Sequence, residues 1–482
     1  MRVLLLTLAA LAATAQTLEE KIEALVRQTP AIQRAYWGAH ALSLGTGNVL
    51  VARNAGSYFV PASNTKLFST ALALARLPAD HHMRTRLVAG APLDAHGVLP
   101  GDLVLTGGGD PTLSGRPVPY QKSAANGDPV AAFDLLAAQA WQAGLRSVDG
   151  DIIGDDSAWV HEPYPDGWAV QDLLAEYGAP VSALSVHDNA VRVHVTPGPA
   201  PGDPARVWLT PALGFYSIDS RVSTAADSLI RADQLPGSRM LRLWGTVSLQ
   251  GGTSFPVAVT DPARYAAYVM REALIRRGIA VHGGIGVRHC YALIGAGPAP
   301  TGPELASRNS PPVPELVKIV NKVSQNLHAE MLLREAARAL GKAPSRGAAL
   351  ELLRGFLAEA GIAASDTHLQ DGSGLSRLTL ATPVAFTTLL RYMHSSPQAE
   401  VWLDSLPIGG EDGTLSTRFR GIAPSRVIAK TGSVAHVAAL SGYLDRARGE
   451  RIAFSVLVNN ANAPASEIRR FIDRIVLLLA EE

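Results

Sequence analysis

The stretch 61–68, Pro-Ala-Ser-Asn-Thr-Lys-Leu-Phe, constrains this chain more than any other part of it. Pro61 suits the first turn of a helix, because it needs no amide partner there and its φ is already helical. The apolar residues that follow, as far as Leu74, predict a helix that begins at Pro61 and buries one side. Ser63 and Lys66 are three residues apart, so on a helix they share a face and the amine can reach the hydroxyl.

This pair has the chemistry of a nucleophile and its base. A serine hydroxyl is a poor nucleophile until a neighbouring base takes its proton. Lys66 can be that base only if burial or another cation lowers its pKa. At Ser63 the helix N-terminus would also favour a developing oxyanion. The alternative is a solvent-facing serine and lysine, although Lys66 alone among the seven lysines has a serine three residues before it.

Two further motifs follow the first in a fixed order. Ser-Gln-Asn at 324–326 lies inside the segment 315–340, whose apolar spacing predicts one helix. Lys-Thr-Gly-Ser at 430–433 closes a strand-like run ahead of a second strand. The order Ser-x-x-Lys, Ser-x-Asn, Lys-Thr-Gly is the motif set of penicillin-binding proteins and serine β-lactamases. Three matches in this order argue against coincidence.

The N-terminus has the pattern of a secretory signal, residues 1–15. Arg2 is a short basic region, residues 3–12 form an apolar core, and 13–15 are a small-residue cleavage site. The apolar run is shorter than the roughly 20 residues that a membrane-spanning helix needs. We therefore expect an exported, periplasmic or otherwise extracytoplasmic protein without a transmembrane anchor, soluble or peripherally associated with the cell wall.

Composition argues against several function classes. A net charge of +1 without a basic run gives no support for a nucleic-acid partner or an anionic membrane surface. Cys290 is the only cysteine, so no intrachain disulfide is possible, and we expect it to be buried as a small apolar residue. The chain has no His-Glu-x-x-His, cysteine pair or Gly-rich phosphate loop, so its motifs imply neither a metal nor another cofactor.

Longer stretches narrow the family. The segments 61–66, 101–105, 107–113, 371–377 and 406–420 resemble the type-4 penicillin-binding proteins, which are D-alanyl-D-alanine carboxypeptidases and endopeptidases of low molecular mass. The resemblance covers nearly all of the chain after the signal, and Asp-Gly-Ser-Gly-Leu-Ser-Arg at 371–377 is its most specific part. It implies cleavage of peptidoglycan stem peptides and cross-links through an acyl-enzyme, with β-lactam antibiotics as covalent inhibitors and no cofactor.

The resemblance also implies a multi-domain α/β fold. A transpeptidase domain of the serine β-lactamase-like kind, with a five-stranded antiparallel sheet flanked by helices, is expected from residues 16–79 and 298–482. Between them, residues 80–297 change to short β-like runs separated by glycine, proline and aspartate. This predicts inserted, mostly β domains, with a second insert nested at about 189–250. All three motifs lie outside the insert.

Each motif residue then has an expected role. Ser63 attacks the carbonyl between two D-alanines while Lys66 takes its proton. The Lys430 cation lowers the pKa of Lys66 and attracts the substrate carboxylate. Ser324 relays a proton to the leaving D-alanine. Asn326 holds the substrate's peptide group and Lys66.

The remaining motif positions are expected to bind substrate. Thr431 donates to the substrate carboxylate, and Gly432 leaves room for substrate along the strand. The backbone amides of Ser63 and Ser433 are the expected oxyanion hole. Gln325 stands where the family usually has aspartate, so we expect an effect on substrate preference more than on chemistry.

Other candidates favour structural roles. His328 is expected to be a solvated helix histidine, and Asp371 and Arg377 a structural ion pair near the cleft. Arg420 is expected on the surface or near a carboxylate, and Asp110 in a tight turn. Trp168 and Tyr177 are expected in the core or at a domain interface.

Two other functions remain possible from the sequence. A serine β-lactamase of class A would need a glutamate followed four residues later by asparagine, and no Glu-x-x-x-Asn occurs in the chain. A β-lactam sensor or scaffold would be acylated without turnover, but such sensors are normally tethered to a membrane. A Ser-His-Asp esterase is disfavoured, because Gly-x-Ser-x-Gly is missing. The sequence leaves open the oligomeric state, the diamino acid of the stem, and whether terminal D-alanine or cross-links are preferred.

Overall fold

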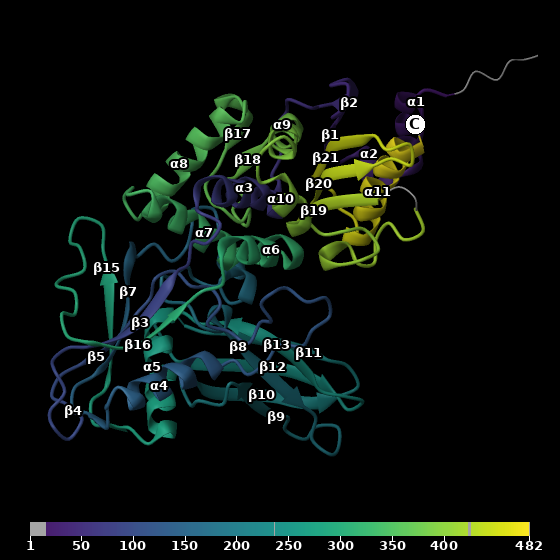
Figure 1. The fold of residues 1–482 in the computed structure, drawn as a ribbon. Coiled ribbons are helices and arrows are strands. Elements are labelled where there is room, and N and C mark those ends of the chain that lie inside the picture. The colour runs from purple at the N-terminus through teal and green to yellow at the C-terminus, as the bar shows by residue number, and fades with distance from the viewer. Residues whose placement is uncertain (1–15, 236, 423–425, 482) are drawn as a thin grey trace, which may run out of the picture.

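The computed structural model describes residues 16–235, 237–422 and 426–481 (Figure 1). The expected signal, residues 1–15, lies outside the described residues. In Figure 1 the segments from both ends of the chain form an upper body, and β3 to β16 form a lower one. We call these the transpeptidase body and the inserted body.

The transpeptidase body is built on an antiparallel sheet in the order β19-β20-β21-β1-β2. Its strands are β1 (Tyr36–Ser43), β2 (Val49–Arg53), β19 (Arg426–Val434), β20 (Val437–Asp445) and β21 (Arg451–Asn459). Because β1 pairs with β21 along its whole length, the two ends of the chain close one sheet. The expected antiparallel sheet is confirmed, with five strands among the described residues.

Helices cover both faces of this sheet (Figure 1). The helices of this body are α1 (Leu18–Gln28), α2 (Pro30–Gln33), α3 (Lys66–Arg76), α6 (Val313–Val323), α7 (Asn326–Ala339), α8 (Arg346–Glu359), α9 (Pro383–His394), α10 (Ala399–Ser405) and α11 (Ala465–Glu481). Alternate residues of a strand point to opposite faces. Val427 and Ala429 accordingly join the core under α11, whereas Ile428 joins the core around α3 and α9.

The segment expected to be one helix over residues 315–340 is two helices. Ser324 has φ 63° and ψ 39°, a left-handed conformation that ends α6. Gln325 then caps α7, because its side chain accepts from the amide of Leu327 at 2.8 Å. Both helices bury their apolar sides in the same core, so the apolar spacing continues across the break and conceals it.

The inserted body consists mainly of strands. These are β3 (Arg84–Ala89), β4 (Val98–Leu99), β5 (Leu103–Thr106), β6 (Ser147–Val148), β7 (Ile152–Val160), β8 (Ala190–Thr196), β9 (Arg206–Thr210), β10 (Ser217–Ala225), β11 (Leu229–Asp233), β12 (Met240–Ser248), β13 (Thr253–Ala258), β14 (Ala280–Val281), β15 (Ile285–Cys290) and β16 (Glu304–Asn309). Its helices α4 (Ala131–Gln142) and α5 (Pro262–Arg277) share a core with these strands. β16 pairs with β3, so the main sheet of the insert runs past residue 297, where we expected the insert to end. β8 to β13 form two smaller sheets around the expected nested insert.

The two bodies meet along α7. His328 of α7 is fully buried, and its Nε2 lies 2.8 Å from Oδ1 of Asp188 in the inserted body. Asp188 also accepts a hydrogen bond from Arg116. The expectation of a solvated His328 is therefore wrong. Its partner is 140 residues away along the chain, beyond the reach of a local pattern.

The first prediction concerns this contact. Asp188→Ala leaves Arg116 and His328 without their shared carboxylate in a buried site, and removing one partner of a buried ion pair costs about 3–5 kcal/mol. We expect a loss of that size in the unfolding free energy of the first transition, measured by urea denaturation. Asp219→Ala is the control, because Asp219 and Arg221 form an exposed pair at 3.7 Å. Equal losses in the two variants would contradict the prediction.

Candidate active site

A short 3-10 helix, η1 (Ala62–Thr65), carries Ser63 and leads directly into α3. The expected helix is present, but its first turn is 3-10 and the α-helix proper begins at Lys66. Residues three apart eclipse one another in a 3-10 helix. Lys66 Nζ accordingly lies 2.7 Å from Ser63 Oγ, and Ser63 is half-buried and open to the cleft.

Lys66 is fully buried, and oxygen acceptors surround its amine. Besides Ser63 Oγ, Nζ donates to Asn326 Oδ1 at 2.6 Å and to the carbonyl of Ser373 at 2.7 Å. Burial lowers the pKa of Lys66 to about 7, against the charges of Asp371 and Glu330, which raise it. Near neutral pH a large share of Lys66 is therefore uncharged and able to accept a proton.

Lys430 of β19 approaches the same site from the sheet. Its Nζ donates to Ser324 Oγ at 2.8 Å and to the carbonyl of Thr431 at 2.8 Å. Burial lowers the pKa of Lys430 well below the ordinary lysine value, and the charge of Lys66 lowers it further. The pKa of Lys66 is lowered mainly by burial. The sequence motifs had indicated the charge of Lys430 as the cause.

Asn326 is the first residue of α7, after the break at Ser324. Its oxygen accepts from Lys66, and its Nδ2 donates to the carbonyl of Tyr177 in the inserted body at 2.7 Å. The inserted body thus fixes the orientation of this amide. Tyr177 lies in the 3-10 helix η3 (Glu176–Gly178), and no local sequence pattern indicated this contact.

β19 is an edge strand of the sheet. Its outer side pairs with segment 407–409 at residues 427–429, and beyond this bridge residues 431–433 line the cavity at Ser63, where an extended peptide can pair with the strand. Gly432 lies against the nucleophile's turn. A Cβ on it would stand 2.6 Å from the Pro61 carbonyl oxygen and 3.2 Å from the Asn64 nitrogen. Glycine is therefore needed here for the strand to approach η1, in addition to the expected room for substrate. Thr431 Oγ1 donates to Thr414 Oγ1 at 2.8 Å.

Glu330 is a site residue that the sequence did not single out. It lies four residues after Asn326 on α7, so the two share a face. Its Oε1 accepts from the amides of Gly372 and Ser373, both at 2.8 Å, and the Ser373 carbonyl in turn accepts from Lys66. Burial, then the charge of Asp371, raises the pKa of Glu330 to about 7. The four-residue spacing from Asn326 was the sequence feature that could have indicated Glu330 as a site residue.

The 371–377 segment forms a polar loop behind Lys66. Asp371 accepts from the Ser376 amide and from Thr379 Oγ1, each at 2.8 Å, and from Trp168 Nε1 at 3.1 Å. In the described part of the chain Arg377 donates to the Ala435 carbonyl at 3.0 Å, and no ion pair joins it to Asp371. The expected Asp371–Arg377 pair is therefore wrong. Trp168 lies at the domain interface, as expected.

Two cavities meet at Ser63. One has a volume of about 710 Å³ and also touches Ser324, Thr431 and α11. The other, of about 430 Å³, lies towards Tyr177, Asn326 and Arg377. Ser63, Ser324 and Ser433 line both cavities, so the predicted motif residues stand at the junction of a cleft that continues in two directions.

The D-Ala-D-Ala carboxypeptidase 3 (S13) family matches residues 18–481 of the chain. The chain belongs to this family. It is 34% identical to the D-alanyl-D-alanine carboxypeptidase of Actinomadura sp. (strain R39) over 483 residues, covering 96% of this chain and 84% of the relative. The expected resemblance is confirmed, and the chain is a serine peptidase, a hydrolase of the D-alanyl-D-alanine carboxypeptidase class.

Solved structures show the same fold. The crystal structure of penicillin-binding protein 4 (DacB) from Haemophilus influenzae matches with a TM-score of 0.82 at 23% identity, covering 95% of this S13 chain and 99% of that one. The same protein complexed with a novel β-lactam matches with a TM-score of 0.77 at 22% identity, covering 95% and 99%. The expected fold class, an α/β transpeptidase domain with inserted mostly β structure, is confirmed.

The weaker candidates of this S13 chain have the following positions. Arg420 is exposed and donates to the Ser416 carbonyl at 3.3 Å. Asp110 accepts from the Thr112 amide at 2.8 Å, as a tight turn requires, and also pairs with Arg308. Cys290 is only half-buried, in contrast to the expected full burial. Across the described residues, no helix combines the length and the hydropathy needed to cross a membrane.

The second prediction concerns Lys66. Because its neutral form must accept the serine proton and burial lowers its pKa to about 7, acylation should fall below pH 7 and level off above it. Lys430→Ala removes a neighbouring cation and admits water, and both changes favour the charged form of Lys66. The rising limb of the acylation pH profile should therefore move to higher pH, but its apparent pKa should stay below the ~10.4 of free lysine. The measurement is the acylation rate with a chromogenic β-lactam. A carboxylate-free acyl donor controls for lost carboxylate binding. An unmoved limb would show that burial alone tunes Lys66.

The third prediction concerns Glu330. Glu330→Gln keeps an acceptor for the Gly372 and Ser373 amides but removes a negative charge that raises the pKa of Lys66. The limb of the same pH profile should therefore move to lower pH. Glu359→Gln, which alters only an exposed partner of Arg76, is the control and should leave the limb in place. A shift to higher pH, or none, would exclude the charge of Glu330 as an influence on Lys66.

Proposed function

We propose that this S13 peptidase cleaves D-alanyl-D-alanine ends and D-alanyl cross-links of peptidoglycan stem peptides through an acyl-enzyme on Ser63. One observation carries the proposal: a buried lysine whose pKa is about 7 lies 2.7 Å from the hydroxyl of Ser63 at the junction of two cavities. The substrate lies outside the cytoplasmic membrane, in agreement with the export expected from residues 1–15.

Acylation uses the two lysines and the two serines. Neutral Lys66 takes the proton of Ser63 as Oγ attacks the carbonyl carbon, and a carbon–oxygen bond forms. The carbonyl electrons move to its oxygen, which the amides of Ser63 and Ser433 stabilise. When the carbon–nitrogen bond breaks, the leaving amine takes a proton from Ser324. The proton first taken by Lys66 replaces it, so Lys66 is neutral again, while Lys430 holds Ser324 by its hydrogen bond throughout.

Hydrolysis completes the cycle. After the amine leaves, water enters its place and attacks the carbonyl carbon while Lys66 takes one of its protons. As the carbon–oxygen bond to Ser63 breaks, Lys66 returns that proton to Oγ, which releases the peptide acid and restores Ser63. With a β-lactam the same carbon–nitrogen bond breaks, but the amine stays tethered to the acyl group. It therefore remains in the position that water needs, and the adduct is long-lived.

The two-sided cleft favours activity on cross-links as well as on free ends. A terminal D-alanine needs little space beyond the scissile bond, whereas a cross-link continues as a second peptide. Cavities of about 710 Å³ and about 430 Å³ extend from Ser63 in different directions, and each is large enough for several residues of substrate. This supports an endopeptidase activity beside the carboxypeptidase activity.

The competing functions are less well supported. A class A β-lactamase needs a glutamate that activates the deacylating water in the cleft. Glu330 is fully buried behind Lys66 and lines neither of the two cavities at Ser63. A sensor or scaffold would not turn over peptide substrates, whereas a cleft that continues in two directions admits water to Ser63 once a peptide amine has left.

The fourth prediction tests the nucleophile. Penicillin should add its mass to the intact mature protein, and cross-linked muropeptides should be converted to monomers and shortened stems. Ser63→Ala should abolish the adduct and lower turnover on the order of a thousand-fold or more, because no other group replaces the hydroxyl. Ser57→Ala, a nearby serine outside the motifs, should behave as wild type. An adduct that persists in Ser63→Ala would show that another residue is the nucleophile.

A further inference from the structure

Two histidines and an aspartate converge in the inserted body, away from the cleft. Asp156 lies on β7, His161 just after that strand, and His289 on the neighbouring strand β15. One ligand atom from each residue lies within 4.8 Å of the others. Within the ranges that the structure describes, this is the one such group of three. None of the three lines either cavity at Ser63.

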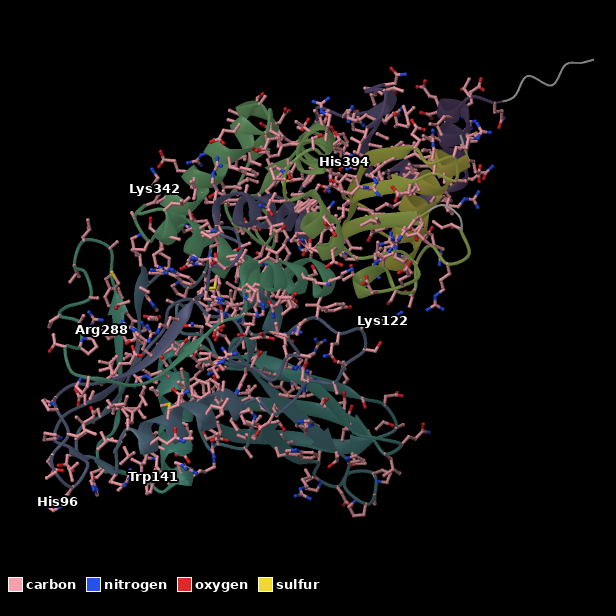
Figure 2. All side chains as sticks on the ribbon, viewed as in Figure 1. His96, Lys122, Trp141, Arg288, Lys342 and His394 are labelled. Atoms are coloured by element: carbon pink, nitrogen blue, oxygen red, sulfur yellow. The ribbon has the colours of Figure 1, made fainter. Side chains whose placement is uncertain are left out.

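An irregularity in the sheet brings these side chains together. β7 and β15 pair in register up to Asp155 and Arg288, and the next pair is Val160 with Cys290. Four residues of β7 therefore face one residue of β15, His289. Irregularities of this kind re-aim side chains and occur often beside functional sites. Figure 2 labels Arg288, one residue before His289, on the outer side of the inserted body.

Asp156 and the preceding residue, Asp155, have different kinds of partner. Asp155 points to the opposite face of the strand and is paired with Arg288 at 2.6 Å. Asp156 is also buried, but its neighbours are two imidazole rings and not a guanidinium group. Its Oδ1 lies 2.8 Å from His289 Nδ1, and its Oδ2 lies 3.8 Å from His161 Nδ1.

The geometry suits a transition-metal ion. The two imidazole rings lie 4.1 Å apart and tilted by 43°, with a nitrogen of each towards the same carboxylate. A zinc ion binds two histidines and a carboxylate at about 2.0–2.2 Å and completes its shell with water. His161 is 28% exposed, so water reaches the site. Ser182 Oγ donates to Asp156 Oδ2 at 2.9 Å and holds the carboxylate in place, as partners of metal ligands commonly do.

We propose that Asp156, His161 and His289 bind one zinc ion, which stabilises the contact between the inserted body and the transpeptidase body. Glu162, the next residue after His161, accepts hydrogen bonds from two helices of the transpeptidase body, α7 and α8. Arg334 of α7 donates to its carbonyl at 2.7 Å, and the amide that begins α8, of Arg346, donates to its carboxylate at 2.7 Å. Zinc thus ties β7, β15 and this segment together beside α7, which carries Asn326.

The spacing of the three ligands explains why no sequence motif indicated this site. Metal motifs place their ligands a few residues apart on one element, whereas these ligands stand at positions 156, 161 and 289. The lack of a metal motif therefore does not bear on this site. The proposal is independent of the peptidase chemistry, because it concerns a different body of the protein.

The fifth prediction tests the site with the metal alone. The mature, tag-free protein, treated with EDTA and desalted, is titrated with zinc sulfate by calorimetry, and bound zinc is counted after equilibrium dialysis. We expect about one zinc per chain with a Kd below ~10 μM, and a higher melting temperature with zinc present. Magnesium should not bind, because it prefers oxygen ligands.

Variants distinguish this site from adventitious binding. His161→Ala changes a partly exposed ligand, so it should fold, and it should weaken zinc binding at least tenfold and remove the thermal shift. His289→Ala should do the same. His96→Ala is the control, since His96 is exposed and labelled at the far tip of the inserted body in Figure 2. Undetectable binding at 100 μM zinc in wild type, or equal binding in the ligand variants, would overturn the proposal.

Discussion

The burial of one amine, that of Lys66, is the constraint on which the site depends. An ammonium group has three donors, and removing it from water is costly unless each finds an acceptor. Ser63, Asn326 and Ser373 supply the three acceptors, from η1, α7 and the loop behind α3. Because the acceptors come from separate elements, their positions are fixed only when all of these elements are packed. The chemistry of the site is therefore a consequence of tertiary structure and not of the helix alone.

The sheet and the inserted body place those elements. Pairing of β1 with β21 joins the two ends of the chain, and Gly432 lets the edge strand β19 approach η1. The inserted body then acts on α7, since the carbonyl of Tyr177 orients Asn326. The insert therefore helps to build the site even though none of the three motifs lies in it. This gives a physical reason why so long an insertion is compatible with, and useful to, a site made from the two ends of the chain.

Local sequence patterns predicted individual helices, strand-like runs and the motif residues, because each of these depends on short-range spacing. The five-stranded sheet with helices on both faces was expected from the family resemblance, since its strands pair across the whole chain. The patterns failed where a partner is far away along the chain. The break at Ser324 was concealed because both helices keep one apolar side, and the buried pair of His328 and Asp188 joins residues 140 apart. Glu330 was missed for a related reason. Its position on α7 was visible, but the loop amides that need its carboxylate could not be placed beside it.

Burial acts on Lys66 and Glu330 in opposite directions and brings them to the same pKa range. It removes the charge of an amine by lowering the pKa and that of a carboxyl by raising it, and here both reach about 7. The charge of Glu330 raises the pKa of Lys66, so protonation of Glu330 favours the neutral form of Lys66. Lys66 can thus become a base without the large penalty of an isolated buried charge. The fraction of Lys66 that is neutral near pH 7 therefore depends on the protonation state of Glu330 as well as on burial.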